Sequence, residues 1–446
     1  MNPAPAAQTI VVGLGATGLS VARYLAARGE RFDVADSRAE PPGMDDLADI
    51  DERAKLHPGA FDPALFAGCR CLIVSPGVAV SEPAVQVALA AGVEVIGDIE
   101  LFAREAQAPI CAISGSNGKS TVTSMVADMV RRSGFAAAAG GNLGPPALDL
   151  LARAQPDFYV LELSSFQLET TISLAPKSAA VLNLSVDHMD RYADLDAYCA
   201  AKARIYRDAE TCVVNRDDPH VVHMANEHSI SFGLDPPAAG QFGLRERDGE
   251  RWLCKGETPV LLESELPIVG LHNVANALAA LALGDTLALP VDSMLVALRS
   301  YAGLPHRTEL VAEHAGVCWY NDSKATNIGA TLAAIDGLPG RIVLIAGGDG
   351  KGADFSRLKA AVARKVRTLI VLGRDADIIV EAVAGATPVI KVDDMRTAVR
   401  EANALAQSGD CVLLSPACAS FDMFQNYARR GEVFMQAVRE ELQHAG

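Results

Sequence analysis

The chain has 446 residues, of which 50% are hydrophobic and 21% charged, a balance typical of a globular protein with two to four domains. Its net charge of −16 argues against a nucleic-acid-binding protein, which usually carries a basic face, but it allows an anionic substrate held by a local basic cluster. The 9 cysteines include no CxxC pair and their number is odd, so we expect reduced thiols in a cytoplasmic protein, not disulfides or a zinc site.

Residues 1–98 are expected to form a first α/β domain. Residues 1–8 carry neither the basic region nor the apolar region of a signal peptide. Strands are predicted at 9–12, 32–35 and 71–74, with a helix at 19–28. This βαβ pattern implies a parallel sheet.

A glycine turn, GxGxxG at residues 13–18, lies between the first strand and the first helix, and Asp36 ends the second strand. This is the dinucleotide fingerprint, in which glycines let the backbone approach a pyrophosphate at a helix N-terminus. Three interpretations remain open at this point: a nicotinamide dehydrogenase, a holder for another nucleotide diphosphate, and a plain structural turn.

A phosphate loop is predicted at residues 115–121, Gly-Ser-Asn-Gly-Lys-Ser-Thr, between a strand at 110–113 and a helix at 121–132. Backbone N–H groups of such a turn bind anions, Lys119 supplies a mobile positive charge, and Ser120 can offer its hydroxyl to Mg²⁺. The usual P-loop has a glycine six residues before the lysine, where this chain has Ile113. The loop is therefore a shortened variant.

Three further residues follow predicted elements of this second domain. Glu162 ends a strand at 158–161, at the sheet edge where α/β proteins bind ligands, so it is a candidate Mg²⁺ ligand; a structural salt bridge would explain it equally well. His188 follows a strand predicted at 181–184, and a lone histidine is more often structural. Lys202, on a helix at 196–208, would by itself be a solvated lysine.

The second domain is expected to continue to residue 302. Residues 229–268 are interpreted as a β-rich excursion, followed by a helix at 273–283. Asn273 and Asn276 at its start can cap the helix or pair with a base edge. The best candidate for a membrane span, 277–290, is interrupted by Gly284 and Asp285, so we expect no membrane insertion.

The third domain, 303–446, follows a junction that contains Arg307. Strands are predicted at 317–321, 342–346, 369–372 and 411–414, and three polar loops follow strands at 321–327, 347–351 and 415–422. The ends of parallel strands form one crevice, where Thr326, Lys351 and Ser420 could receive a small carboxylate.

In this order the motifs closely resemble the Mur ligase family of peptidoglycan synthesis, over essentially the whole chain. The segments that carry the resemblance are 13–18, 75–77, 115–121, 141–142, 161–169, 187–192, 202, 272–276, 303–307, 321–327, 347–351 and 415–422. The shortened phosphate loop is the normal form in this family. The DNPR motif of the diaminopimelate-adding members is absent, which favours the branch that adds D-glutamate.

The resemblance implies three domains. Residues 1–98 would be a Rossmann-like domain that holds the UDP end of UDP-N-acetylmuramoyl-L-alanine without a nicotinamide. Residues 99–302 would be a P-loop-type ATPase domain, and 303–446 a Rossmann-like domain for D-glutamate. The implied activity is an ATP-dependent amide ligation through an acyl phosphate and a tetrahedral intermediate, by a cytoplasmic monomer with two Mg²⁺ ions.

The resemblance also implies a role for individual residues. Lys119, His188 and Lys202 would be catalytic, with Lys202 carbamylated. ATP would contact Gly115, Ser116, Asn117, Gly118, Lys119, Ser120, Thr121, Asn273, Asn276, Arg307, Asp322 and Lys324. The UDP-linked substrate would contact Gly15, Ala16, Thr17, Asp36, Ser37, Gly77 and Asn142, and D-glutamate would contact Thr326, Lys351, Ser420 and Phe421. The Mg²⁺ ligands would be Ser120, Glu162, His188 and Lys202. Phe421 stands where the family pattern leads us to expect leucine.

Three rival functions are compatible with parts of the sequence. A folylpolyglutamate-type ligase would share the central domain but not the uridine-binding one. A nicotinamide dehydrogenase would leave residues 115–121 and Glu162 unexplained. A non-catalytic sensor on a retained fold conflicts with the intact set of Lys119, Glu162, His188 and Lys202.

Overall fold

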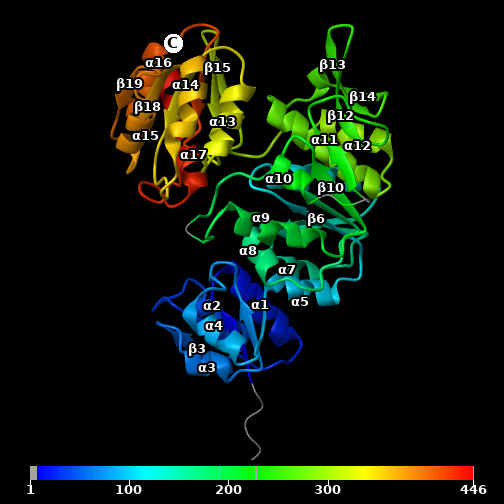
Figure 1. The fold of residues 1–446 in the computed structure, drawn as a ribbon. Coiled ribbons are helices and arrows are strands. Elements are labelled where there is room, and N and C mark those ends of the chain that lie inside the picture. The colour runs from blue at the N-terminus through cyan, green and yellow to red at the C-terminus, as the bar shows by residue number, and fades with distance from the viewer. Residues whose placement is uncertain (1–7, 190, 225, 227–228, 445–446) are drawn as a thin grey trace, which may run out of the picture.

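A computed structural model describes residues 8–189, 191–224, 226 and 229–444 of the chain. Three separate β-sheets organise this described part, each built from one continuous stretch of sequence. We refer to the N-terminal unit (8–97), the central unit (98–302) and the C-terminal unit (303–444). In Figure 1 the N-terminal unit, in blue, lies below the central unit, and the C-terminal unit, in yellow to red, lies beside the upper part of the central unit.

The N-terminal sheet has the strand order β3-β2-β1-β4-β5, with every neighbouring pair parallel. Alternate residues of β1 face opposite sides, because Val11 belongs to one hydrophobic core and Ile10 and Val12 to another. The strands are β1 Thr9–Val12, β2 Phe32–Asp36, β3 Leu56–Pro58, β4 Cys71–Val74 and β5 Glu94–Ile96, and the helices are α1 Ala16–Ala27, α2 Met44–Ile50, α3 Pro63–Ala67 and α4 Pro83–Ala90.

The N-terminal and central units share a hydrophobic core. Leu25 of α1 and Val11 of β1 belong to the same buried cluster as Phe102 of α5 (Asp98–Glu105) and Leu161 of β8. Asp149 of α7 (Ala147–Leu151) adds a polar link, since it accepts hydrogen bonds from Ser20 Oγ at 2.7 Å and Arg23 Nη2 at 2.8 Å. The two units are therefore joined by packing as well as by the chain.

The central sheet has the strand order β14-β13-β12-β11-β10-β9-β6-β8-β7. It is parallel from β7 to β12 and antiparallel from β12 to β14, so the predicted β-rich excursion at 229–268 contains the parallel strand β11 and the antiparallel end of the sheet. The strands are β6 Ile110–Ser114, β7 Ala137–Gly141, β8 Phe158–Glu162, β9 Ser178–Val181, β10 Thr211–Asn215, β11 Ser229–Phe232, β12 Phe242–Arg247, β13 Glu250–Lys255 and β14 Thr258–Leu262. The remaining α-helices are α6 Lys119–Arg132, α8 Ser165–Glu169, α9 Leu195–Ala203, α10 Pro219–Val222, α11 Leu271–Thr286 and α12 Val291–Arg299, with 3-10 turns at Arg204–Tyr206 and Glu263–Glu265.

Two predicted elements of the central unit differ from the structure. The strand predicted at 181–184 is β9, which ends at Val181 because the chain then turns toward the phosphate loop, where Asn183 O accepts from Ser116 N–H. The helix α11 runs through Gly284 and Asp285 to Thr286, beyond the predicted end at 283, and Met294 occupies the space that a side chain at Gly284 would need. Across the described ranges, no helix is both long and apolar enough to cross a membrane.

The C-terminal sheet has the strand order β15-β16-β20-β17-β18-β19, parallel except for the β15–β16 pair. Both faces of β17 are buried, Leu344 in one core and Ile345 in another. The strands are β15 Glu309–His314, β16 Val317–Asn321, β17 Ile342–Ala346, β18 Val366–Val371, β19 Val389–Lys391 and β20 Cys411–Leu414. The helices are α13 Ile328–Gly337, α14 Lys359–Lys365, α15 Ala376–Ala382, α16 Met395–Leu405 and α17 Tyr427–His444, with a 3-10 turn at Phe355–Leu358. The α/β fold class with parallel-dominated sheets is confirmed; the exact domain boundaries remain predictions.

Candidate active site

The phosphate loop begins at Gly115, later than in the usual P-loop pattern, because strand β6 continues to Ser114. Ile113, at the position of the missing P-loop glycine, is still paired with Glu162 and Ala180 inside the sheet. Gly115 then turns with φ +142°, where a Cβ would press against Leu182, and Gly118 turns with φ +84°, where a Cβ would collide with Asn276. Both glycines are therefore required by the turn that leads into α6.

Two lysines converge on the loop. Lys119 Nζ donates to the carbonyl oxygens of Gly115 at 2.9 Å and Ser116 at 3.0 Å, and Lys202 Nζ donates to Gly115 O at 3.0 Å. Lys202 is only 2% exposed and lies 4.8 Å from the ring centre of Tyr198. Burial, reinforced by the charge of Lys119, holds the pKa of Lys202 well below its usual range. Its amine is therefore poised to be neutral and nucleophilic.

Glu162 ends β8 with one satisfied and one unsatisfied carboxylate oxygen. Its Oε1 accepts a hydrogen bond from Asn142 Nδ2 at 2.6 Å, while its buried Oε2 has no hydrogen-bond partner. A buried carboxylate oxygen without a partner is costly, so this position fits a cation. In the described ranges no three His, Cys, Asp or Glu side chains gather closely enough to hold a metal by themselves. That is compatible with Mg²⁺, which is usually held by one or two carboxylates together with substrate phosphates.

His188 lies on the loop between β9 and α9. It adopts a left-handed backbone conformation with φ +58°, and its ring packs edge-on against Phe166 at 4.8 Å. Its Nε2 is 3.8 Å from Asp187 Oδ2, but burial outweighs this carboxylate and lowers the pKa of His188. The imidazole is therefore held neutral, the form that can bind a metal.

A cavity of about 400 Å³ lies where the central and C-terminal units meet. Arg307 crosses between the units and donates to Ser120 Oγ at 2.7 Å. The predicted site residues that line this cavity are Ser116, Asn117, Gly118, Lys119, Ser120, Asn142, Glu162, His188, Lys202, Arg307, Lys324, Thr326 and Lys351.

A smaller pocket of about 100 Å³ adjoins this cavity. The predicted site residues that line it are Asn117, Gly118, Thr121, Asn273, Asn276, Arg307, Asp322 and Lys324. Four of them (Asn117, Gly118, Arg307 and Lys324) line the large cavity too. A nucleotide whose base lay in the small pocket would therefore have its phosphates directed toward the phosphate loop.

Two ionisable groups in the small pocket have displaced pKa values. Burial raises the pKa of Asp322 to about 7, although its carboxylate accepts from Ser415 Oγ at 2.8 Å and Thr308 N–H at 3.1 Å. Burial and the nearby Arg307 lower the pKa of Lys324 to about 8, and its Nζ lies 4.1 Å from the ring centre of Tyr427.

The residues expected to hold the UDP end lie mainly at the carboxyl edge of the N-terminal sheet, which is the ligand-binding edge of such sheets. Asp36 Oδ2 accepts from Leu14 N–H at 2.7 Å, and Asp36 is bound by both arms of Arg38, whose hydrogen bonds lower the pKa of Asp36 to about 2. Gly15, Ala16, Thr17, Asp36, Ser37 and Gly77 do not line the large cavity, whereas Asn142 does.

The four residues expected to contact D-glutamate separate into two pairs. Thr326 and Lys351 line the large cavity. Ser420 is buried and Phe421 is 70% exposed, and neither side chain lines that cavity. The assignment of all four to D-glutamate remains a prediction.

Several residues of the site were missed in the sequence. Tyr198 hydrogen-bonds Ser116 Oγ at 3.1 Å and shares a helix face with Lys202, so its i, i+4 spacing was a usable signal. Asn327, which donates to Asp187 Oδ2 at 3.1 Å, lies in a polar loop already singled out. Tyr427 lines the cavity from the start of α17, and nothing in the local sequence indicates it.

Family profiles cover most of the chain. The profile of the Mur ligase middle domain matches residues 113–284, that of the Mur ligase MurD-like N-terminal domain matches 7–97, and that of the Mur ligase glutamate ligase domain matches 306–418.

Individual relatives extend over almost the whole length. The UDP-N-acetylmuramoylalanine–D-glutamate ligase of Nitrosococcus oceani is 54% identical over 99% of this chain and 98% of its own. The enzyme of the same name from Pseudomonas fluorescens is 53% identical over 97% of each chain. Among solved structures, the MurF ligase of Thermotoga maritima in complex with ADP has a TM-score of 0.62 at 15% identity, covering 93% of this chain and 96% of its own, which indicates a shared fold.

Proposed function

The chain belongs to the Mur ligase family, whose members are ATP-dependent ligases, and on that premise we propose that it joins D-glutamate to UDP-N-acetylmuramoyl-L-alanine. The observation that carries this proposal is the cavity in which Lys119, Glu162 and Lys202 of the central unit face Lys324 and Lys351 of the C-terminal unit. Relatives that are more than half identical over nearly the whole chain carry the name of this D-glutamate ligase.

The reaction needs the substrate carboxylate to be activated. Transfer of the γ-phosphoryl group of ATP to the L-alanine carboxylate makes an acyl phosphate. The amine of D-glutamate then attacks its carbonyl carbon, and phosphate leaves from the tetrahedral intermediate. Both steps build negative charge on oxygens, so the protein's main task is to place positive charge and donors around them.

We propose that the ammonium group of Lys119 stabilises the negative charge that builds up on these oxygens. In the free enzyme its ammonium group rests on the carbonyl oxygens of Gly115 and Ser116 and is within reach of phosphates seated on the same loop. Arg307, bonded to Ser120 Oγ, would turn to the phosphates in the same way. The adenine would lie in the small pocket beside Asn273 and Asn276.

Glu162, Ser120 and His188 are proposed to hold two Mg²⁺ ions together with Lys202. Bound Mg²⁺ would neutralise phosphate charge and polarise the phosphoryl group. The partnerless Oε2 of Glu162 supports a cation at that position. A lysine ammonium cannot bind a cation, so Lys202 is proposed to react with carbon dioxide: its neutral nitrogen bonds to carbon, a proton is released, and the carbamate oxygens become hard ligands.

The acyl phosphate must be kept from water, so we propose that the three units close around the substrates before the reaction. D-glutamate would enter from the C-terminal unit near Thr326 and Lys351, and the UDP end would lie along the glycine turn of the N-terminal unit. We also propose that the protein is a cytoplasmic monomer, as its family resemblance implies.

The proposal is tested by measuring phosphate release from ATP with UDP-N-acetylmuramoyl-L-alanine and a panel of amino acids. Release with D-glutamate alone is the expected result. Release with another amino acid would move the chain to a different branch of the family, and no release with any amino acid would support a sensor.

A further inference from the structure

Arg191 reaches from the central unit into the N-terminal unit and has no part in the chemistry described above. Its two terminal nitrogens donate to backbone oxygens of the N-terminal unit, Nη1 to Pro76 O at 3.1 Å and Nη2 to Val78 O at 2.8 Å. The guanidinium carbon lies 4.3 Å from the ring centre of Phe166, and the side chain is 14% exposed. An arginine that is largely buried and donates to two carbonyl oxygens of another unit makes a specific contact between the two units.

The other side of this contact is His188. The backbone N–H of Arg191 donates to His188 O at 2.9 Å, and His188 itself has a left-handed backbone conformation with φ +58°. Phe166 contacts the ring of His188 at 4.8 Å as well as the guanidinium of Arg191. A displacement of Arg191 would therefore reach His188 through both this hydrogen bond and the ring.

The carbonyls that Arg191 binds belong to a turn of the predicted UDP site. Val78 N–H donates to Ser75 O at 2.9 Å, and Ser75 Oγ donates at 3.1 Å to the carbonyl of Gly13 in the glycine turn. Gly77, one of the residues expected to contact the UDP-linked substrate, lies between the two bonded carbonyls. A ligand on the glycine turn would thus press on the same short segment that Arg191 holds.

We propose that Arg191 is a positioning residue that couples the seating of a UDP-linked substrate on residues 75–78 to the position of His188 in the cavity. The inference rests on the proposed function for the identity of that substrate. Arginine suits this role because its planar fork donates in two fixed directions while its face lies on an aromatic ring. Lysine would retain the charge but not the fork.

Kinetics of Arg191→Lys and Arg191→Ala test the coupling. For both variants we expect kcat to fall and KM for UDP-N-acetylmuramoyl-L-alanine to rise about tenfold or more, while KM for ATP and D-glutamate stays within about twofold. Added guanidinium ion should restore part of the activity of Arg191→Ala. An equal change in all three KM values would overturn the inference, because it would indicate a general structural defect.

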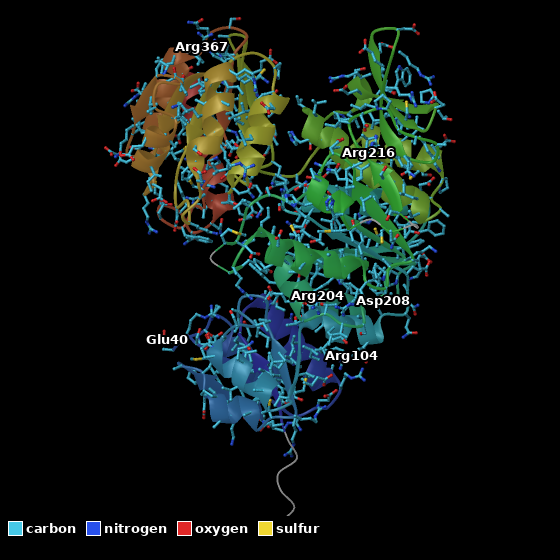
Figure 2. The ribbon with its side chains drawn as sticks, viewed as in Figure 1. Glu40, Arg104, Arg204, Asp208, Arg216 and Arg367 are labelled. Carbon is cyan, nitrogen blue, oxygen red and sulfur yellow. The ribbon has the colours of Figure 1, made fainter. Side chains whose placement is uncertain are left out.

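Arg204→Lys is the matched control. Arg204, labelled in Figure 2 between the N-terminal unit and the rest of the central unit, is partly buried and likewise donates to a backbone oxygen, Thr171 O at 2.9 Å. That bond stays inside the central unit, so its loss should not separate the three KM values.

Amide hydrogen exchange gives a readout that does not depend on turnover. In the wild type, UDP-N-acetylmuramoyl-L-alanine should slow exchange in both 75–78 and 186–189; in Arg191→Ala it should protect only the first segment. Even without ligand, the variant should exchange faster in both segments, and unchanged exchange there would sink the inference. A wild type that shows linked protection but releases no phosphate with D-glutamate would count against the proposed function alone.

Discussion

Lys119 and Lys202 donate to the same acceptor, the carbonyl oxygen of Gly115, at 2.9 and 3.0 Å. Two ammonium groups that share one acceptor repel each other, and the one with less access to water gives up its proton more easily. The pKa of Lys202 is lowered by burial first and by Lys119 second. The carbonyl oxygen of Gly115 thus connects Lys119, which is proposed to stabilise phosphate charge, with Lys202, which is proposed to react with carbon dioxide.

Replacing Lys202 should therefore remove more than a positive charge. Lys202→Ala should lose activity on the order of a hundredfold or more, because the proposed Mg²⁺ ligand is gone. Acetate, which can supply a carboxylate in the vacated space, should restore part of it. Lys202→Arg is the matched control, because it fills the space with a cation and should be inactive with or without acetate. Full activity of the unrescued alanine variant would refute the carbamate.

Nucleotide binding should weaken as pH rises through about 8. Lys324 lines the small pocket, and its pKa is lowered to about 8, so its positive charge is present below that pH and lost above it. Titration calorimetry with ATP between pH 6.5 and 9.5 should show this loss of affinity. Lys324→Arg stays charged throughout the range and should flatten the profile; parallel profiles for the two proteins would exclude Lys324 as the cause.

Closure of the C-terminal unit should depend on Asn327. This residue donates to Asp187 Oδ2 at 3.1 Å and caps α13 by accepting from Ala330 N–H. Asn327→Asp keeps the cap but places two carboxylates together, so the liganded variant should have a larger radius of gyration than the liganded wild type in small-angle scattering. Asn403→Asp is the control, since Asn403 donates to Glu441 within one unit at a similar 3.1 Å. Identical scattering profiles for wild type with and without ligands would argue against closure itself.

Asp98 should make the protein less stable as pH rises. The carboxyl group is buried at the start of α5, its Oδ1 has no partner, and burial raises its pKa from 3.8 to about 6. The folded state therefore binds this proton more tightly than the unfolded chain, and the resulting stability is complete below about pH 4 and lost as pH rises through 6. The loss amounts to about 3 kcal/mol. Thermal denaturation should show Asp98→Asn gaining on the wild type between pH 4.5 and 7.5, whereas the exposed Asp49→Asn should show no such change.

The sequence predicted those parts of the site that depend on one strand and the turn after it. Glu162 and residues 115–121 are of this kind, because a strand end fixes where the next few side chains lie. The contact of Tyr427 with Lys324 could not be predicted locally, since it depends on how α17 packs against the loop after β16 within the C-terminal unit. The end of β9 at Val181 was also misplaced, because the chain turns after it toward the phosphate loop, where Asn183 O accepts from Ser116 N–H, instead of extending the strand.

The residues assigned to D-glutamate also show which positions the local sequence could predict and which it could not. Thr326 lies in the loop 321–327 that follows β16, and it lines the cavity. Phe421 belongs to a longer loop after β20, whose course is set by backbone contacts such as Asp349 with Ala419 across the unit. A loop shaped by distant backbone pairing cannot be placed from its own residues.

The hydrophobic cluster that contains Leu25, Phe102 and Leu161 limits where the chain can be divided into fragments. A fragment that ends at residue 97 would keep Leu25 but lose Phe102 and Leu161, which would expose a hydrophobic surface. Such a fragment should bind a hydrophobic dye and aggregate. Chimaeras that exchange the N-terminal unit between relatives would accordingly need to exchange α5, α7 and β8 along with it, so the exchangeable segment extends beyond the N-terminal sheet.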